Sequence, residues 1–323
     1  MISDITNTWV PSMRRYIDEE ALMKLIQRQG YLDFLRRNRE RPIIKVVSGI
    51  RRCGKSTLFR LFKDELLADN VKPEQIISIN FEELEYEHLR DYHALYQYIL
   101  ERIQPNETNY IFLDEIQHVD QFHRVVDSLF VKENTDLYIT GSNAYFMSSD
   151  IATLLTGRYV EIQMLPLSFS EFYHSKYEGN QYSLIPAYEA YLRESSFPYT
   201  QQLGGEDFDI QEYLRGLYNT LLLHDVVARL KINDVTILQD IVRYIMANIG
   251  SLLSPNKIAN SLVSAGRKID NKTVERYIQG LQDSLLLYKV NRYDVRGKEL
   301  LRINAKYYSV DVTLRNLLVG NAS

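Results

Sequence analysis

The stretch that decides the fold reads Gly-Ile-Arg-Arg-Cys-Gly-Lys-Ser-Thr and occupies Gly49–Thr57. It follows a short apolar, β-branched run, Ile43–Ser48, and precedes a segment with helical periodicity. The stretch fits the pattern G-x-x-x-x-G-K-[ST], in which glycines let the backbone bend tightly and aim its amide groups at an anion. We therefore predict a buried strand, a loop that holds phosphate groups, and a helix whose positive end faces them.

Each residue type in this loop has a chemical reason. The ammonium group of Lys55 can pair with the β- and γ-phosphates of a nucleotide, and the Ser56 hydroxyl can bind Mg²⁺. The alternative is a turn that binds nothing, but the strand before the loop and the helix after it are what phosphate binding requires. The residues expected to contact the nucleotide are Gly49, Ile50, Arg51, Arg52, Cys53, Gly54, Lys55, Ser56 and Thr57.

Two acidic residues end another predicted strand, Tyr110–Glu115. Ligands of open α/β sheets bind at the carboxyl ends of the strands, so both acids are expected beside the phosphate loop. Asp114 is predicted to share the Mg²⁺ site with Ser56, and Glu115 to orient and polarise the attacking water. The alternative is a strand that ends in a solvated acidic turn.

Polar residues also end the neighbouring strands. Ser142 or Asn143, at the end of the predicted strand Asp136–Ser142, could contact the γ-phosphate or the water. Asn80 ends a further strand, and we hypothesise a hydrogen bond from it to Glu115. A turn rich in glycine and serine, and an asparagine with no catalytic part, are the alternatives.

Arg158 precedes the last predicted strand of this region. We expect it to act as a catalytic residue that reaches a nucleotide on a neighbouring subunit. An arginine supplied in this way stabilises the charge of the transition state. An ordinary structural arginine is the alternative.

Strand-like and helical segments alternate between residues 41 and 166. Such alternation predicts an α/β fold with a parallel sheet and right-handed crossovers, here the core of a P-loop ATPase. A helical lead-in is expected over residues 1–40, and a helical lid over residues 167–237. The five strands are expected at residues 43–48, 76–81, 110–115, 136–142 and 159–165.

Residues 238–323 are predicted to form a winged-helix-like domain, with three helices before a hairpin around Arg296–Lys298. Ser254 and Asp270 are suited to cap the second and third helices, and Pro255 to begin the second. From residue 238 to residue 310 there are 12 Lys and Arg against 6 Asp and Glu, an excess of +6 in a chain of net charge −4. The excess favours an anionic partner, and the region could bind DNA or dock a protein.

Composition excludes several classes of protein. Cys53 is the only cysteine, which excludes an internal disulfide and favours a reducing cytoplasm. We find no secretory signal and no run of the ~18 apolar residues that a membrane helix needs, so no membrane partner is expected. The histidine spacing does not suit zinc. The absence of an Asn-Lys-x-Asp motif favours ATP over GTP.

The motifs GIRRCGKST, YIFLDEIQ, ITGSNA, LLTGRY and MLPLSFSEF occur in this order. With them the chain resembles prokaryotic AAA+ ATPases that carry a restriction-nuclease-like domain at the C-terminus. The resemblance covers residues 42–320 and implies nucleotide binding, hydrolysis and self-assembly as a homo-oligomer. In two respects the chain departs from the pattern: Ser195–Pro198 replaces a Gly-Gly-Phe-Pro turn, and the nuclease-like portion is expected to be absent after Ser323.

Two functions are therefore expected. In the first, Mg²⁺-dependent ATP hydrolysis drives a conformational change of the lid and the winged-helix-like region. In the second, the nucleotide gates a module that binds DNA or protein, and turnover is negligible.

Overall fold

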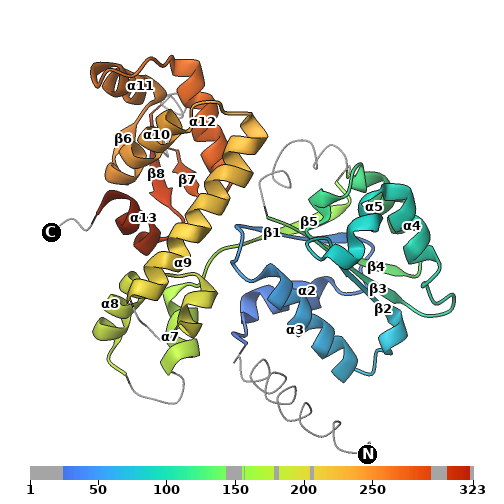
Figure 1. Ribbon diagram of the computed structural model, residues 1–323. Helices are drawn as coiled ribbons and strands as arrows, with labels where there is room; N and C mark the ends of the chain where they lie inside the picture. The colour runs from blue at the N-terminus through green and yellow to red at the C-terminus, as the bar shows by residue number, and fades with distance from the viewer. Residues whose placement is uncertain are drawn as a thin grey trace, which may run out of the picture.

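A computed structural model of the chain describes residues 25–142, 155, 157–177, 182–203, 207–291 and 304–320. Asn143 and the Arg296–Lys298 turn lie outside these residues, as does most of the expected lead-in. Figure 1 shows an α/β part that holds the larger sheet and a largely helical part that leads to the C-terminus. Within the described ranges, no helix is long and apolar enough to cross a membrane.

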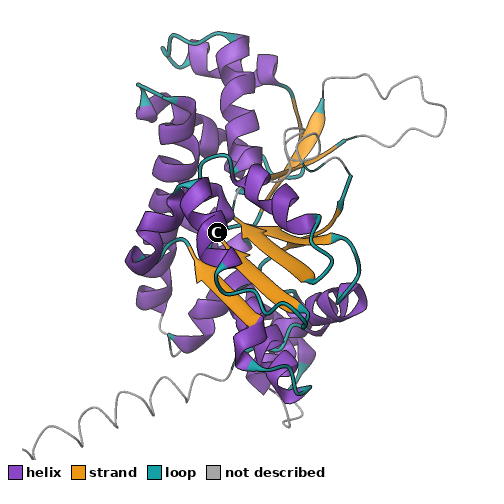
Figure 2. Ribbon diagram, turned by 90° about the vertical axis from the view of Figure 1, so that its right-hand side faces the viewer, coloured by secondary structure: helices purple, strands orange, loops and turns teal. Residues whose placement is uncertain are grey.

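The predicted five-stranded parallel sheet is confirmed. Its spatial order is β2-β3-β4-β1-β5, and every neighbouring pair is parallel. Figure 2 shows these strands running alongside one another, with helices around them. All carboxyl ends therefore lie at one edge, where the phosphate loop leaves β1. The strands are β1 Ile44–Gly49, β2 Ile76–Asn80, β3 Asn109–Asp114, β4 Thr135–Gly141 and β5 Tyr159–Met164.

Helices cover both faces of this sheet. Figure 1 shows α2 and α3 on one face, and α4 and α5 on the other. Successive strand residues point to opposite faces. Phe112 thus packs against Phe59 of α3, with ring centroids 5.1 Å apart, while Ile111 belongs to the core beneath α5. The helices of this part are α2 Gln29–Asn38, α3 Lys55–Ala68, α4 Tyr92–Leu100 and α5 Phe122–Phe130, with short turns η1 Pro73–Gln75, η2 Leu84–Arg90 and η3 Ile116–His118.

The helical register expected for the lead-in is wrong at Leu25 and Ile26. Both residues precede α2 and have no regular secondary structure. The next side chain with a defined role, Arg28, is buried against backbone carbonyls of other segments. The expected helix thus does not extend over the residues that precede these tertiary contacts.

The segment after β5 is helical, as predicted. A π-helix, η5, continues directly from α9, and Figure 1 shows the two as a rod that rises toward the C-terminal elements. π-Helices are rare, and when they occur as single-turn bulges they are often found at functional sites; η5 is longer, at eight residues. The helices are α7 Phe169–Tyr177, α8 Leu184–Glu194, η4 Pro198–Gln202, α9 Asp207–Thr220, η5 Leu221–Ala228 and α10 Val235–Ala247.

The C-terminal elements form a small antiparallel sheet beside three helices. Its strand order is β6-β8-β7. The expected caps are present, because Ser254 accepts a hydrogen bond from the Lys257 amide and Asp270 accepts one from the Thr273 amide. The elements are β6 Leu252–Leu253, α11 Pro255–Ser264, α12 Asn271–Asp283, β7 Leu287–Val290, β8 Ala305–Ser309 and α13 Val312–Val319.

The turn at Ser195 is stabilised by side-chain hydrogen bonds. Ser195 has φ of 75°, a conformation that favours glycine. Its hydroxyl donates to the buried Asp311 carboxylate at 3.0 Å, and the Ser196 amide and hydroxyl donate to the same oxygen at 2.7 Å. Asp311 also caps α13. The two serines therefore join the turn before η4 to the C-terminal helix, and their two hydroxyl bonds are ones that glycines could not make.

Candidate nucleotide-binding site

The phosphate loop links β1 to α3 along a route that depends on glycine. A Cβ atom on Gly49 would lie 2.4 Å from the carbonyl oxygen of Met164 on β5. Gly54 caps α3 with φ of 105°, and Arg52 also has a positive φ of 65°. The loop thus turns sharply at the carboxyl end of β1, and the positive end of α3 faces the space that the loop encloses.

Lys55 is buried at the mouth of this loop. Its ammonium donates to the Gly49 carbonyl at 3.0 Å and lies 3.1 Å from a Glu115 carboxylate oxygen. Burial lowers the pKa of Lys55, but the charge of Glu115 and its hydrogen bond, together with the charges of Cys53 and Asp114, outweigh burial, so the pKa lies above its ordinary value. Lys55 therefore carries a positive charge at neutral pH, at the place where phosphate is expected.

Asp114 and Ser56 lie together, as a shared Mg²⁺ site requires. Burial raises the pKa of Asp114, and hydrogen bonds from Ser56 and Thr140 oppose that rise. Mg²⁺ usually takes one or two carboxylates with waters and phosphate oxygens for the rest, so a hydroxyl beside one carboxylate fits it. Across the described ranges there is no group of three His, Cys, Asp or Glu that would form an all-protein metal cage.

Glu115 adopts an unusual backbone conformation at the end of β3. Its φ of 55° and ψ of 46° are in the left-handed region, and its amide donates to the Thr140 hydroxyl at 2.8 Å. Burial raises the pKa of its carboxyl, but the Lys55 charge and hydrogen bonds from Gln117 and Ser142 bring the pKa below its ordinary value. Glu115 is therefore anionic at neutral pH. Backbone strain of this kind is characteristic of functional sites.

Gln117 is a site residue that the sequence analysis missed. Its amide nitrogen donates to Glu115 and, at 3.3 Å, to the Ser142 hydroxyl, while its buried carbonyl oxygen has no partner among the described residues. The turn η3 redirects the chain and brings Gln117 over Glu115. Ser142 thereby lies beside the acidic pair.

Two expected side chains do not join this group. The hypothesised bond from Asn80 to Glu115 is wrong, because the Asn80 amide donates to Glu83 at 3.0 Å instead. Arg158 lies just before β5, at the amino edge of the sheet, opposite the phosphate loop. It is 46% exposed and lies 3.9 Å from Asp127. Within one chain, Arg158 is therefore remote from Lys55.

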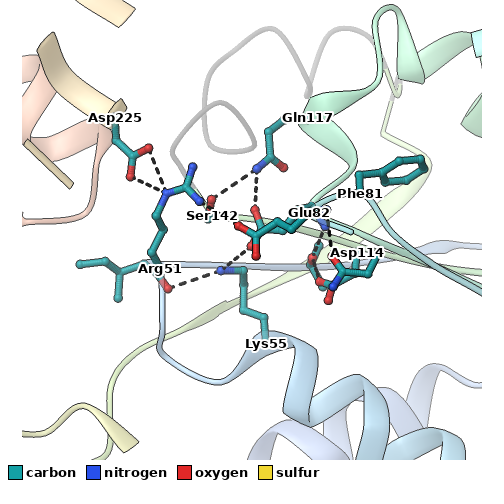
Figure 3. Close-up of polar contacts among 12 residues, drawn as sticks. Arg51, Lys55, Phe81, Glu82, Asp114, Gln117, Ser142 and Asp225 are labelled. Carbon is teal, nitrogen blue, oxygen red and sulfur yellow. Dashed lines mark hydrogen bonds and ion pairs between the residues drawn. The ribbon is translucent and has the colours of Figure 1, made fainter. Parts of the chain in front are cut away.

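Arg51 connects the phosphate loop to the π-helix η5. Its Nε lies 3.1 and 3.0 Å from the two carboxylate oxygens of Asp225, and its Nη1 lies 3.0 Å from Glu82. Figure 3 shows Arg51 rising from the loop past Lys55 toward Asp225 and Ser142. Asp225 is buried and 174 residues away in sequence, so no local signal could have paired it with Arg51.

Arg28 secures the loop from its other side. Its guanidinium bonds to both carboxylate oxygens of Glu171 on α7, at 2.8 and 2.9 Å. It also donates to the backbone carbonyls of Cys53, Leu165 and Pro166 at 3.2, 2.6 and 3.2 Å. A single buried side chain thus joins the phosphate loop, the end of β5 and the first helix after it.

A small, largely apolar pocket of about 60 Å³ opens beside the loop. Apolar walls with a few polar groups are typical of small-ligand sites. Leu25 and Ile26, which are displaced from the expected helix, contribute to its wall. The lining residues are Leu25, Ile26, Arg28, Cys53, Gly54, Thr57, Leu58, Leu61, Met164, Pro198 and Gln202.

Comparisons with known proteins agree with this geometry. Residues 41–173 match the family described as AAA domain, and residues 185–323 match a domain of unknown function, DUF8612. An uncharacterised protein of Haemophilus influenzae is 38% identical over 299 residues, which are 92% of this chain and 74% of that protein. An uncharacterised protein of Methanocaldococcus jannaschii is 30% identical over 285 residues, 83% of this chain and 60% of the relative.

The fold itself is similar to that of a solved structure. A Walker-type ATPase of Pyrococcus abyssi aligns with a TM-score of 0.58 at 18% identity, over 91% of this chain and 95% of that one. At this identity the likeness concerns the fold alone. It extends beyond the sheet to the helical and C-terminal parts, because most of both chains is covered.

Proposed function

The chain belongs to one family with the Haemophilus influenzae protein and contains an AAA domain, and on this premise we propose that it binds ATP with Mg²⁺ and hydrolyses it to ADP and phosphate. The observation that carries the proposal is the meeting of Lys55, Glu115 and Asp114 at one edge of the sheet. An isolated phosphate-binding turn would not need two buried acids beside the lysine. The relation to ATPases with a nuclease-like domain stays a prediction.

Each side chain has a distinct part in the proposed reaction. Lys55 and the loop amides would hold the phosphates, and Ser56 and Asp114 would hold Mg²⁺, which supplies neutralisation of phosphate charge. Glu115, anionic at neutral pH, orients the attacking water and polarises it. The free carbonyl oxygen of Gln117 can accept a second hydrogen bond from that water, while its amide fixes Glu115.

ATP fits the site better than a nucleotide whose base is recognised mainly by hydrogen bonds. The pocket beside the loop offers an apolar wall from Leu25, Ile26 and Met164, against which a flat base can pack. The base would then contact the lead-in through Leu25 and Ile26, and η4 through Pro198 and Gln202.

Two substitutions test the proposal. Lys55→Ala removes the phosphate-binding charge, and we expect loss of ATP binding by calorimetry. Glu115→Gln keeps the side-chain shape, and we expect retained binding with turnover lower by a factor of ~10²–10⁴, the contribution of a general base. Lys72→Ala, at an exposed lysine that pairs with Glu107 at 2.6 Å, is the control and should do neither. Equal turnover by Glu115→Gln and the parent would remove Glu115 from catalysis.

Arg158 can contribute to hydrolysis only across a subunit boundary. It is exposed at the sheet edge opposite Lys55, so we propose that it serves the nucleotide of a neighbouring copy in a homo-oligomer. A trans arginine accounts for a factor of ~10³–10⁵ in rate in known cases. Arg158→Ala should then reduce turnover only at concentrations at which the chain assembles.

A second candidate function is favoured by the C-terminal elements. Their order, α10-β6-α11-α12-β7-β8, with an antiparallel sheet, supports the proposal that they act as a winged-helix-like module. The exposed Lys272 and Arg276 on α12 could contact DNA phosphates, although Glu275 lies between them. In this function ATP is a switch and turnover is negligible. Turnover measured with and without duplex DNA separates this function from the first. A DNA affinity that falls as the salt concentration rises would favour DNA, rather than a protein, as the partner.

A further inference from the structure

Arg51 is held by carboxylates that come from outside the phosphate loop. Asp225, which is 4% exposed, belongs to η5, and Glu82, which is 52% exposed, follows β2. The first contact is a near-symmetric one from Nε to both oxygens, and the second is a single bond. A buried partner and a solvated partner thus hold one guanidinium at the mouth of the loop.

Arg51 also lies within range of the catalytic group. Burial lowers its pKa, but the charges of Asp225, Glu115 and Glu82 together raise the pKa above its ordinary value. Glu115 in turn contacts the Lys55 ammonium at 3.1 Å. Lys55 and Arg51 are therefore two cations near one carboxylate, and Figure 3 shows Lys55 reaching the sheet edge from α3 while the Arg51 side chain extends toward Asp225.

The π-helix that carries Asp225 is packed closely on α12. A Cβ atom on Gly280 of α12 would lie 2.5 Å from Leu230 and 3.2 Å from Val226, the residue after Asp225. One turn further, Arg229 pairs with Asp283 at the end of α12, at 2.6 Å. A shift of η5 has no free space at Gly280 and must therefore move α12 or break this pair.

We propose that Arg51 distinguishes a nucleoside triphosphate from a diphosphate at this site, and that its ion pair with Asp225 transmits the distinction to α12. The inference rests on the proposed function. A terminal phosphate beside Lys55 attracts the Arg51 guanidinium and competes with Asp225 for it. Loss of the counter-charge leaves a buried carboxylate in η5, which favours a changed η5 and, through Val226 and Arg229, a changed α12.

The first experiment compares the affinities of ADP and a non-hydrolysable ATP analogue. Arg51→Ala should weaken the analogue by more than about tenfold, the loss expected for a charge-assisted hydrogen bond, and change ADP affinity by less than about twofold. Arg60→Ala, an exposed arginine of α3, is the control for lost charge. Removal of Arg51 alone leaves Asp225 unpaired. The double variant Arg51→Gln/Asp225→Asn removes both charges, and it should show the same loss of discrimination between the two nucleotides as Arg51→Ala.

The second experiment follows amide hydrogen exchange of α12. In the parent, the ATP analogue should change exchange over residues 271–283 and ADP should not. Asp225→Asn should bind the analogue yet show the same α12 exchange with and without it, whereas Glu82→Gln should respond as the parent does.

The outcomes separate this inference from the proposed function. A parent chain that binds neither nucleotide overturns both. A parent that binds both, with Arg51→Ala weakening the two nucleotides equally or Asp225→Asn keeping the α12 response, overturns this inference alone and leaves the ATPase proposal in place.

Discussion

Truncation of Arg28 to alanine should destabilise the chain far more than truncation of a surface arginine. Arg28 is 5% exposed at its side chain, and its partner Glu171 is 23% exposed. The substitution removes both bonds to Glu171 and the bonds to three backbone carbonyls. It also removes the contact that ties the Cys53 carbonyl to α7.

The magnitude follows from burial. Removal of one member of a buried pair costs ~3–5 kcal/mol, because the remaining charge is left without a partner. Glu171 is partly solvated and can regain water, which favours the lower end, about 3 kcal/mol. Arg36 provides the contrast. It pairs with Glu65 and Asp33 at 2.6 Å but is 39% exposed, so its truncation should cost ~0–1 kcal/mol.

Urea unfolding of Arg28→Ala, Arg36→Ala and the parent would measure these differences. A double variant, Arg28→Met/Glu171→Gln, removes both charges and should be less destabilised than the sum of the two single changes. If Arg28→Ala lies within 1 kcal/mol of Arg36→Ala, or if the double variant is strictly additive, the reasoning from burial is refuted.

Two further predictions concern the loop and its acid. Gly49→Ala should lower the unfolding free energy by ~1–3 kcal/mol and abolish ATP binding, because the new methyl group meets the Met164 carbonyl at 2.4 Å and β5 must move. Gly30→Ala, in α2 with nothing within 4 Å of the new methyl group, should instead raise the unfolding free energy by ~0.5–1 kcal/mol. Equal effects of the two substitutions in urea unfolding would contradict this reasoning. The pKa of Glu115 lies below its ordinary 4.5, so its contribution to stability is complete above that pH and is lost as the pH falls through the lowered pKa. The unfolding free energy of Glu115→Gln should therefore fall less between pH 7 and pH 3 than that of the parent. An equally steep fall in the two proteins would exclude this contribution.

The amino-acid sequence by itself determined the sheet strands and the phosphate loop. The run Ile43–Ser48 is mainly apolar and β-branched, which is typical of a strand buried on both sides, and β1 is indeed buried throughout, with Lys45 paired to Asp136. Gly49 and Gly54 specify a sharp bend locally, and Ser254 and Asp270 cap helices through atoms three residues away. These features depend on neighbours in the chain, so their signals are local.

Tertiary structure alone decided which side chains complete the site. Arg28 finds Glu171 at a separation of 143 residues, and Arg51 finds Asp225 at 174. No periodicity encodes such pairs, because they depend on how the helical segment folds back over the sheet edge. Tertiary packing also places Leu25 and Ile26 in the wall of the pocket beside the loop. The Asn80 amide, by contrast, finds a partner only three residues along the chain, at Glu83, rather than the acid that follows β3. Local patterns thus fix the backbone of the loop, while the burial of charge across distant segments fixes what surrounds it.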